Sequence, residues 1–409
     1  MSARAPILRS DAEMQLAAHF NMIRGRKTAD MAVREAAFSR FEAVGLPNRR
    51  VEAWHYTDLR RLMSEALAPS APPKTLELVS KSAPRIEFVD GYFVGAVDLP
   101  AGMSLKTASI APAPLGNEDV LVALNTAFAP ETLEISVAAD ADIAAPLHIL
   151  SKFKRRGAAT TRVIIHVGAG ARLTVLEEAR AESGQINSLV HFDIGDGATV
   201  EHVALCGNAG QNIATFSAIL GENSVLDSFA LVAGGGLTRR QAFVRFDGEN
   251  SKAGLRGISL LKGQQHADTT LVVEHAAPHC ESRELFKHIL DSEAKGVFQG
   301  KIVVQPHAQK TDGVMKSNTL ALSDTASMSN KPELEIFADD VVCGHGATVG
   351  QIDEDQMFYL RARGLPRPEA ESLLIEAFAL GALDFVANED LRDLLTAKIH
   401  TWLHTRHGE

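Results

Sequence analysis

Ile164-Ile165-His166-Val167 runs directly into Gly168-Ala169-Gly170-Ala171, so a short hydrophobic run rich in β-branched residues ends in a glycine-rich turn. The same arrangement returns three more times, in Phe192-Asp193-Ile194 with Gly195-Asp196-Gly197-Ala198, in Ala218-Ile219-Leu220 with Gly221-Glu222-Asn223-Ser224, and in Val244-Arg245-Phe246 with Asp247-Gly248-Glu249-Asn250. The four turns begin at positions 168, 195, 221 and 247, which are 27, 26 and 26 residues apart. A second hydrophobic run follows the turns, so each repeat holds two or more short strands.

A repeat of this length predicts a parallel β-helix, in which stacked turns of the chain bury one continuous core. Each repeat is too short for a helix that crosses between parallel strands, because a strand–helix–strand unit needs about 30 residues or more. Rossmann and β/α-barrel folds are therefore disfavoured. Glycine, aspartate and asparagine are expected at the corners, where the backbone needs positive φ or a local side-chain cap. We expect the mainly β core to occupy residues 76–362.

Helical patterns flank the predicted β-helix on both sides. Residues 1–75 are expected to form a helical region that ends in a proline-rich hinge at 68–74. Residues 363–409 return to helical spacing after a second proline-containing break, and Asn388 is a favourable N-cap for the last helix. This C-terminal helical pair either covers the β-helix or offers a surface to a partner, and its hydrophobic pattern fits both interpretations.

Composition limits the classes of function. The 409 residues are 45% hydrophobic and 22% charged, as in ordinary globular proteins. A net charge of −10, with only 2 Trp and 3 Tyr, argues against nucleic acid as a partner. The three cysteines lie far apart, which argues against a disulfide framework and favours a reducing compartment. The sequence has neither a signal peptide pattern nor a membrane-spanning length, so we expect a cytoplasmic protein without a membrane partner.

The stretch 341–350 combines soft metal ligands with a bare backbone. Cys343 and His345 are two residues apart, so in a strand their side chains share one face, about 6 to 7 Å apart. Zinc and iron–sulfur centres usually take about four ligands. If this pair binds metal, the remaining ligands must come from elsewhere in the chain, from a second chain, or from small thiols and sulfide. The alternative is a buried thiol beside a histidine in a turn.

Three other polar groups have both a chemical and a structural explanation. They are His266 with Asp268, His275 with His279 and Cys280, and His400 with His404 and His407. The first fits an acid–base dyad or a satisfied polar pair at a corner. Pro278 argues against a helix that would place the second group on one face, and the third fits a solvated helix face. No nucleotide-binding loop, nucleophile elbow or H-E-x-x-H motif occurs, so nucleotide-driven or triad chemistry is not predicted.

Several long motifs follow one another in the second half of the chain. They are Gln299–Val304, Ala308–Gly313, Leu320–Ser323, Lys331–Val341 and Cys343–Gly350. In this order they resemble the SufB/SufD family of the SUF iron–sulfur cluster assembly system. The N-terminal Trp54-His55-Tyr56-Thr57-Asp58-Leu59 resembles an element typical of the SufD branch of that family.

The resemblance implies a right-handed parallel β-helix between helical regions, in a scaffold subunit that is not an enzyme. It implies pairing with SufB through the β-helix, with a homodimer as a possibility for the isolated chain. It also implies that the C-terminal helices recruit the ATPase SufC. We expect the contacts with SufC to come from hydrophobic residues of those helices, namely Leu373, Phe378, Leu391, Leu395 and Trp402.

The resemblance also implies a role for the cysteine–histidine pair. Cys343 and His345 match the family's C-x-H at the SufB interface and are expected to ligate a transient, nascent iron–sulfur cluster shared with the partner. The isolated chain is not expected to hold a cofactor stably. Gly344 and Gly346 are expected to let the backbone of the partner come close.

Two other functions compete with this one. The chain is a purely structural subunit if Cys343 and His345 are packing residues. A β-helix enzyme of the hexapeptide acyltransferase type is disfavoured, because that fold uses turns of about 18 residues.

Overall fold

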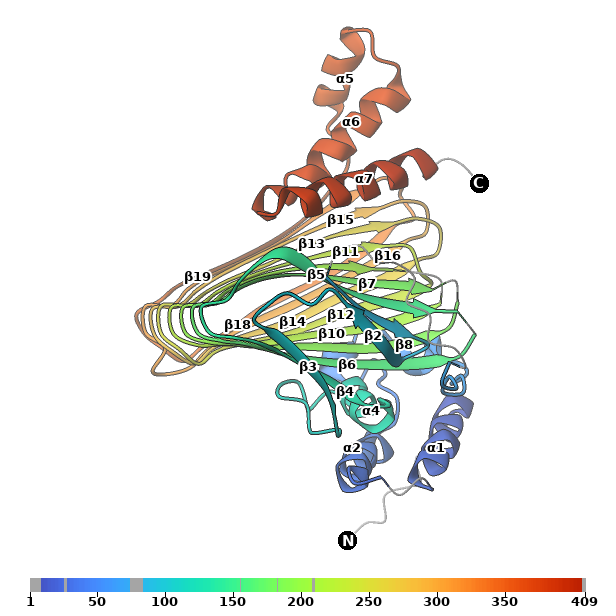
Figure 1. Ribbon diagram of the computed structural model, residues 1–409. Coiled ribbons are helices and arrows are strands. Elements are labelled where there is room, and N and C mark those ends of the chain that lie inside the picture. Colours follow the sequence, from blue (N-terminus) through green and yellow to red (C-terminus); the bar gives the residue numbers. More distant parts are fainter. Residues whose placement is uncertain are drawn as a thin grey trace.

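The computed structural model describes residues 9–25, 28–73, 84–154, 156–181, 183–207 and 210–406 (Figure 1). Most of these residues form a parallel β-helix built from two sheets, as the repeat predicts. The ten-stranded sheet holds β2 (Tyr92–Val97), β1 (Arg85–Val89), β5 (Asp142–Phe153), β7 (Arg172–Ala181), β9 (Thr199–Cys206), β11 (Val225–Ala233), β13 (Lys252–Leu261), β15 (Glu281–Leu290), β17 (Asp312–Ala321) and β19 (Val342–Gly350), in that order.

The nine-stranded sheet faces it across the interior of the β-helix. Its strands are β3 (Met103–Ala108), β4 (Thr132–Val137), β6 (Ala158–Val167), β8 (Gln185–Ile194), β10 (Gln211–Leu220), β12 (Leu237–Phe246), β14 (His266–His275), β16 (Lys295–Val304) and β18 (Ser327–Ile336). Alternate side chains of both sheets point inward and form one long hydrophobic core. We call this interior the lumen.

One corner of the β-helix explains the repeated glycine and asparagine residues. Gly170, Gly197, Asn223 and Asn250 occupy equivalent corner positions with φ of 69°, 69°, 55° and 60°. Glycine and asparagine tolerate this left-handed backbone better than other residues do. Farther along the chain, His279 and Lys310 have φ of 61° and 63°. The repeat is harder to recognise there because ordinary residues occupy the left-handed corners.

Helices cover the outer faces of the two sheets (Figure 1). The N-terminal layer on the nine-stranded sheet contains α1 (Asp11–Arg24), α2 (Met31–Val44), η1 (Glu52–Trp54) and α3 (Leu59–Leu62), and it also includes α4 (Val120–Phe128). Helix α4 follows β3 in the sequence. One helix of this layer therefore comes from residues 76–362, which were predicted to form the β core. Its hydrophobic residues pack against α2 and the sheet rather than in the lumen.

The C-terminal region consists of α5 (Glu354–Ala362), α6 (Arg367–Leu380), η2 (Leu383–Phe385) and α7 (Glu389–Thr405). It begins at α5, before the expected boundary at residue 363. The Asn388 side chain accepts a hydrogen bond from the Leu391 backbone at 3.1 Å, which is the predicted N-cap of α7. Helix α7 packs on the outer face of the ten-stranded sheet, whereas α5 and the adjoining part of α6 project away from it (Figure 1).

Trp54 anchors the N-terminal layer to the nine-stranded sheet. Its side chain is 1% exposed, and its indole N–H donates to Asp119 at 2.9 Å. The Arg239 guanidinium of β12 lies 3.7 Å from the centre of the ring, a cation–π arrangement. The same guanidinium donates to the Ala53 carbonyl at 2.8 Å and pairs with Asp268 at 2.5 Å. A single tryptophan therefore joins η1, α4 and β12.

We predict that Trp54→Ala lowers the free energy of unfolding by about 3–5 kcal/mol, because it leaves a cavity and removes the donor to half-buried Asp119. Trp54→Phe keeps most of the ring and is expected to cost less. Denaturant unfolding measures both values. Val51→Ala, at a neighbouring exposed position, is the control and should change little. A Trp54→Ala variant as stable as the control would contradict the anchoring role.

Candidate functional site

The two ends of the β-helix differ in how their strand edges are covered. At the N-terminal end, β2 pairs antiparallel with β1 and β3 pairs antiparallel with β4. At the C-terminal end, β18 and β19 are the last strands of their sheets, and no described strand pairs with their outer edges. Exposed hydrophobic residues lie on this last turn, including Val342 and Val349 at 70% and 58% exposure. Uncovered strand edges of this kind pair readily with another chain.

Cys343 and His345 lie on β19, at this open end. Their register partners on β17 are Gly313 and Met315, and the Met315 side chain packs in the lumen core. A Cβ atom built on Gly313 would lie 3.6 Å from the Cys343 sulfur and 3.4 Å from the Ser282 hydroxyl. The Cys343 thiol therefore points into the lumen, where it is half-buried, while His345 on the same strand face is exposed. The structure thus places both donors on one face, as their spacing predicts.

The Cys343 thiol is not activated by its surroundings. Burial raises its pKa, and the charges of Asp312 and Glu284 act in the same direction. The thiol is therefore protonated at neutral pH. Metal binding requires the thiolate, so binding at this cysteine must release a proton.

The pair is only part of a metal site. Nowhere in the described ranges does a group of three or more His, Cys, Asp or Glu side chains have an arrangement that could hold a metal ion. Cys343 and His345 supply two donors, and the open end leaves their outer side accessible. Chemically, the arrangement can bind a soft or borderline metal only together with ligands from outside this chain.

Gly344 and Gly346 have no internal reason to be glycine. A Cβ atom on either residue would meet nothing within 4 Å, and neither residue has positive φ. Their missing side chains instead leave the backbone of β19 bare on the outer face of the sheet. The structure leaves space there for another molecule to approach.

Other lumen residues near this end were not singled out by sequence reasoning. Glu284 and His288 on β15 alternate with Phe286 and Leu290 and point inward. Burial raises the pKa of Glu284 to about 8 and lowers that of His288 to about 3. These residues could have been found from the sequence, because they alternate with hydrophobic residues on one face of a predicted strand.

The three other polar groups have structural roles. On the outer face of β14, His266 and Asp268 both contact the Thr57 hydroxyl, and Asp268 also pairs with Arg239. They hold the N-terminal layer in place. His266 has a lowered pKa because it is buried, so it stays neutral there.

His275, His279 and Cys280 do not converge on one point. His275 faces the lumen and bonds to Ser282 at 3.0 Å, and His279 occupies a left-handed corner. The Cys280 thiol donates to the Gly248 carbonyl at 3.3 Å. At the C-terminus, His400 pairs with Glu376 at 2.9 Å, while His407 lies outside the described residues.

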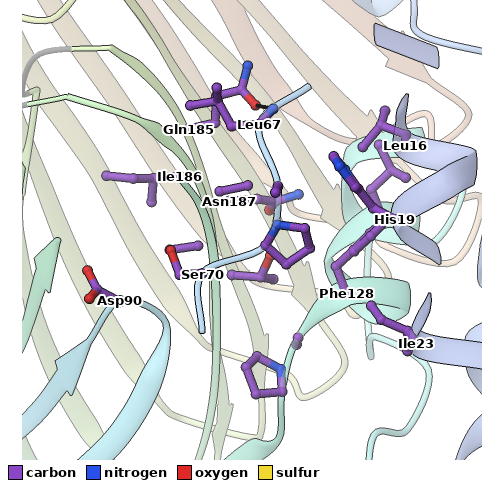
Figure 2. Close-up of a pocket in the computed structure, with 18 of the residues that line it drawn as sticks. Leu16, His19, Ile23, Leu67, Ser70, Asp90, Phe128, Gln185, Ile186 and Asn187 are labelled. Atoms are coloured by element: carbon purple, nitrogen blue, oxygen red, sulfur yellow. Dashed lines mark hydrogen bonds between the residues drawn. The ribbon is translucent and has the colours of Figure 1, made fainter. Parts of the chain in front are cut away.

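A hydrophobic cavity of about 390 Å³ lies between the N-terminal layer and the nine-stranded sheet (Figure 2). Leu16, His19 and Phe128 line its helical side, and Gln185 and Ile186 of β8 line the other side. The Leu67 backbone donates to the Gln185 side chain at 2.7 Å. The cavity lies near the covered end of the β-helix, on the outer face of a sheet, and is therefore separate from Cys343 and His345.

The structure places the residues that were predicted to contact SufC in different environments. Leu391, Leu395 and Trp402 are buried between α7 and the ten-stranded sheet, so in this arrangement they are out of reach of a partner. They cover the β-helix, which was one of the two interpretations of the helical pair. Phe378 also packs against this cluster, and Leu373 on α6 is 43% exposed. The projecting α5 adds exposed aromatic residues, Phe358 and Tyr359.

No helix in the described parts of the chain is both long enough and hydrophobic enough to cross a membrane.

Comparisons with known protein families give two matches. Residues 149–378 match the model of the SufBD core domain of the SUF system for FeS cluster assembly, and residues 16–70 match that of the SufBD protein N-terminal region. The iron–sulfur cluster assembly protein SufD of Escherichia coli is 31% identical to this chain, over 87% of this chain and 89% of its own length.

Two further relatives are more distant but cover similar lengths. A SufBD family protein of Synechocystis is 28% identical, over 94% of both chains. One from Mycobacterium tuberculosis is 27% identical, over 88% of this chain and 89% of its own length. The core-domain match alone spans more than half of the sequence. The chain therefore belongs to the SufBD family of iron–sulfur cluster assembly proteins.

Proposed function

We propose that this chain is a SufD-like scaffold subunit without turnover of its own, which pairs with a SufB-type subunit through the open end of its β-helix. The observation that carries the proposal is the location of Cys343 and His345 on β19, the last strand of the ten-stranded sheet, at the uncovered end. There the pair provides half of a site for a nascent iron–sulfur cluster, and the partner subunit provides the other half.

The edge of β19 supports pairing with a second β-helix. The Val342 backbone N–H donates to the Thr311 carbonyl at 2.9 Å, on the side of β19 that faces β17. Alternate residues of β19 therefore direct their N–H groups toward β17. By the same alternation, the N–H groups of Cys343, His345 and Ala347 point to the outer edge. A partner strand satisfies these groups through main-chain hydrogen bonds, as in β-strand addition. The exposed Val342 and Val349 add hydrophobic area to the same contact.

The incompleteness of the site suits a cluster that must be passed on. Neutral imidazole ligates iron in Rieske centres, so His345 and the Cys343 thiolate are chemically suitable ligands. A complete set of four cysteines would retain the cluster. A site divided between two subunits loses ligands when the interface moves.

A separate surface on the C-terminal helices is proposed to recruit the ATPase SufC. The exposed hydrophobic residues Phe358, Tyr359 and Leu373 lie on α5 and α6, which project away from the sheets (Figure 1). Helix α7 packs on the ten-stranded sheet and connects these helices to the β-helix. Movements of the ATPase could therefore reach the β-helix through α7.

We predict that Cys343→Ala combined with His345→Ala lowers cluster formation on the co-purified complex at least tenfold, because both donors are removed. Association with the SufB-type partner should remain, since the β19 backbone is unchanged. Visible absorbance of the reconstituted cluster and gel filtration measure the two outcomes. Cluster formation at the wild-type level would instead support a purely structural subunit.

Ala347→Pro is expected to weaken pairing with the SufB-type partner. Proline removes an outward-facing N–H and adds a ring at the edge, while the bonds from β19 to β17 are kept. Co-purification of the SufB-type partner should fall strongly, and that of SufC should be unchanged. Retention of both partners would show that pairing does not use this edge.

Phe358→Glu together with Leu373→Glu is expected to abolish co-purification of SufC and to leave the SufB-type partner bound. Both side chains are exposed, at 74% and 43%, so the stability of the fold should change little. Met14→Glu on α1, a hydrophobic residue of similar exposure, is the matched control. Equal loss of SufC from the control, or none from the double variant, would contradict the α5–α6 assignment.

A further inference from the structure

A buried carboxyl group, that of Glu284, lies in the lumen behind the open end. Its residue is 2% exposed, neither carboxylate oxygen makes a hydrogen bond of ordinary geometry within the described residues, and the Ser282 hydroxyl on the same strand is its nearest polar neighbour. Successive register pairs place Glu284 of β15 beside Met315 of β17, and Met315 beside His345 of β19. Glu284 is therefore two strands, or about 10 Å, from His345 in the same inward-facing column. Met315 separates the two residues.

The charged groups around Glu284 do not neutralise it. Arg283, next to it on β15, and Arg256 on β13 both lower the pKa of Glu284. Both arginines lie on the outer face of the sheet, however. There Arg283 pairs with Asp312 at 2.6 Å, and Arg256 pairs with Asp227 at 2.6 Å. Burial outweighs the Ser282 hydroxyl and both arginines, and it raises the pKa of Glu284 to about 8. At neutral pH the group is mainly the uncharged acid.

The other lumen groups near Glu284 do not carry a positive charge at neutral pH. His275 of β14 and His288 of β15 have pKa values lowered by burial to about 4 and about 3, so both are neutral. Met315 of β17 is the register partner of Glu284, and Gly300 of β16 lies against Met315, so neither residue brings a titratable side chain toward Glu284. Beyond them lie Cys343 and His345. Glu284 thus holds a releasable proton close to the half site, without a cation beside it.

We infer that Glu284 compensates the charge of a metal ion bound at Cys343 and His345, being neutral when the half site is empty and ionised when it is filled. The inference rests on the proposed function of that pair. Binding of one Fe²⁺ ion breaks the S–H bond of Cys343 and the O–H bond of Glu284, and two protons are released to solvent. A sulfur–iron bond forms, no oxidation state changes, and the net charge of the lumen is conserved.

The physical reason is the low dielectric of the lumen. A divalent ion with one thiolate and one neutral imidazole leaves a single positive charge beside a hydrophobic core, which is unfavourable. An anion about 10 Å away attracts this positive charge. At an effective dielectric constant of about 20, the attraction raises the affinity for the metal ion by a factor on the order of 10. The two groups are close enough to interact, since the ionised form of Glu284 raises the pKa of Cys343.

The test is titration of Fe(II) into the full chain in complex with its SufB-type partner, without oxygen, by calorimetry in buffers of different ionisation enthalpy. Wild type should release up to one more proton per metal ion than Glu284→Gln between about pH 6 and pH 8. The affinity of Glu284→Gln should be on the order of 10-fold lower above about pH 8 and equal to wild type below about pH 6.

Glu281→Gln on the outer face of the same strand is the matched control and should behave as wild type. Equal proton release and affinity in Glu284→Gln at every pH would overturn the inference and leave the proposed function intact. Loss of Fe(II) binding at every pH would overturn it as well, because Glu284 would then be a direct ligand. Unchanged Fe(II) binding in the Cys343→Ala, His345→Ala variant would instead reject the proposed function.

Folding of the variant gives an independent readout. The pKa of Glu284 is raised in the folded state above its ordinary value of 4.5. Its contribution to stability is therefore present below about pH 4.5 and is lost as the pH rises through about 8. Glu284→Gln, which cannot ionise, should melt at a higher temperature than wild type near pH 8 and at a similar temperature near pH 4.5. A lower melting temperature of Glu284→Gln near pH 8 would contradict the inference that Glu284 is a neutral, buried carboxyl.

Discussion

The constraint that governs this molecule is that every strand of a parallel β-helix needs a neighbour on both edges. Inside the stack, each strand bonds to the turns before and after it. At one end, the antiparallel strands β2 and β3 supply the missing neighbours from the chain itself. At the other end, β18 and β19 have none among the described residues. The fold is therefore closed on one side and open on the other, and the cysteine–histidine pair lies on the open side.

The same geometry determines the chemistry available at that end. A strand that ends the stack points its inward side chains into the mouth of the lumen, where they are partly covered by the turn below and uncovered above. Cys343 is half-buried and His345 exposed for this reason. Behind them the lumen is hydrophobic and polar groups within it are costly unless they are paired or neutral. Glu284 meets that condition by remaining mainly protonated at neutral pH.

Much of the fold could be predicted because the corners impose local requirements. Gly170, Gly197, Asn223 and Asn250 repeat because each takes a left-handed backbone, so the period is visible in the sequence. At His279 the same backbone is imposed by the strands that surround it, and the residue type carries no signal. The C-terminal helices show a different limit. A hydrophobic stripe such as that of α7 packs equally well on its own sheet or on a partner, so tertiary contacts decided between the two.

The candidate site divides in the same way between local and distant information. Cys343 and His345 were predicted as a pair because side chains two apart on a strand share a face, which is a local property. Glu284 precedes them by about sixty residues, and its alignment with His345 depends on the lengths of two successive turns. Register partners on successive turns are 31 residues apart from Glu284 to Met315 and 30 apart from Met315 to His345. In the clear repeats they are 26 residues apart. A variable turn length hides such a column from the sequence, although it leaves the column intact in the stack.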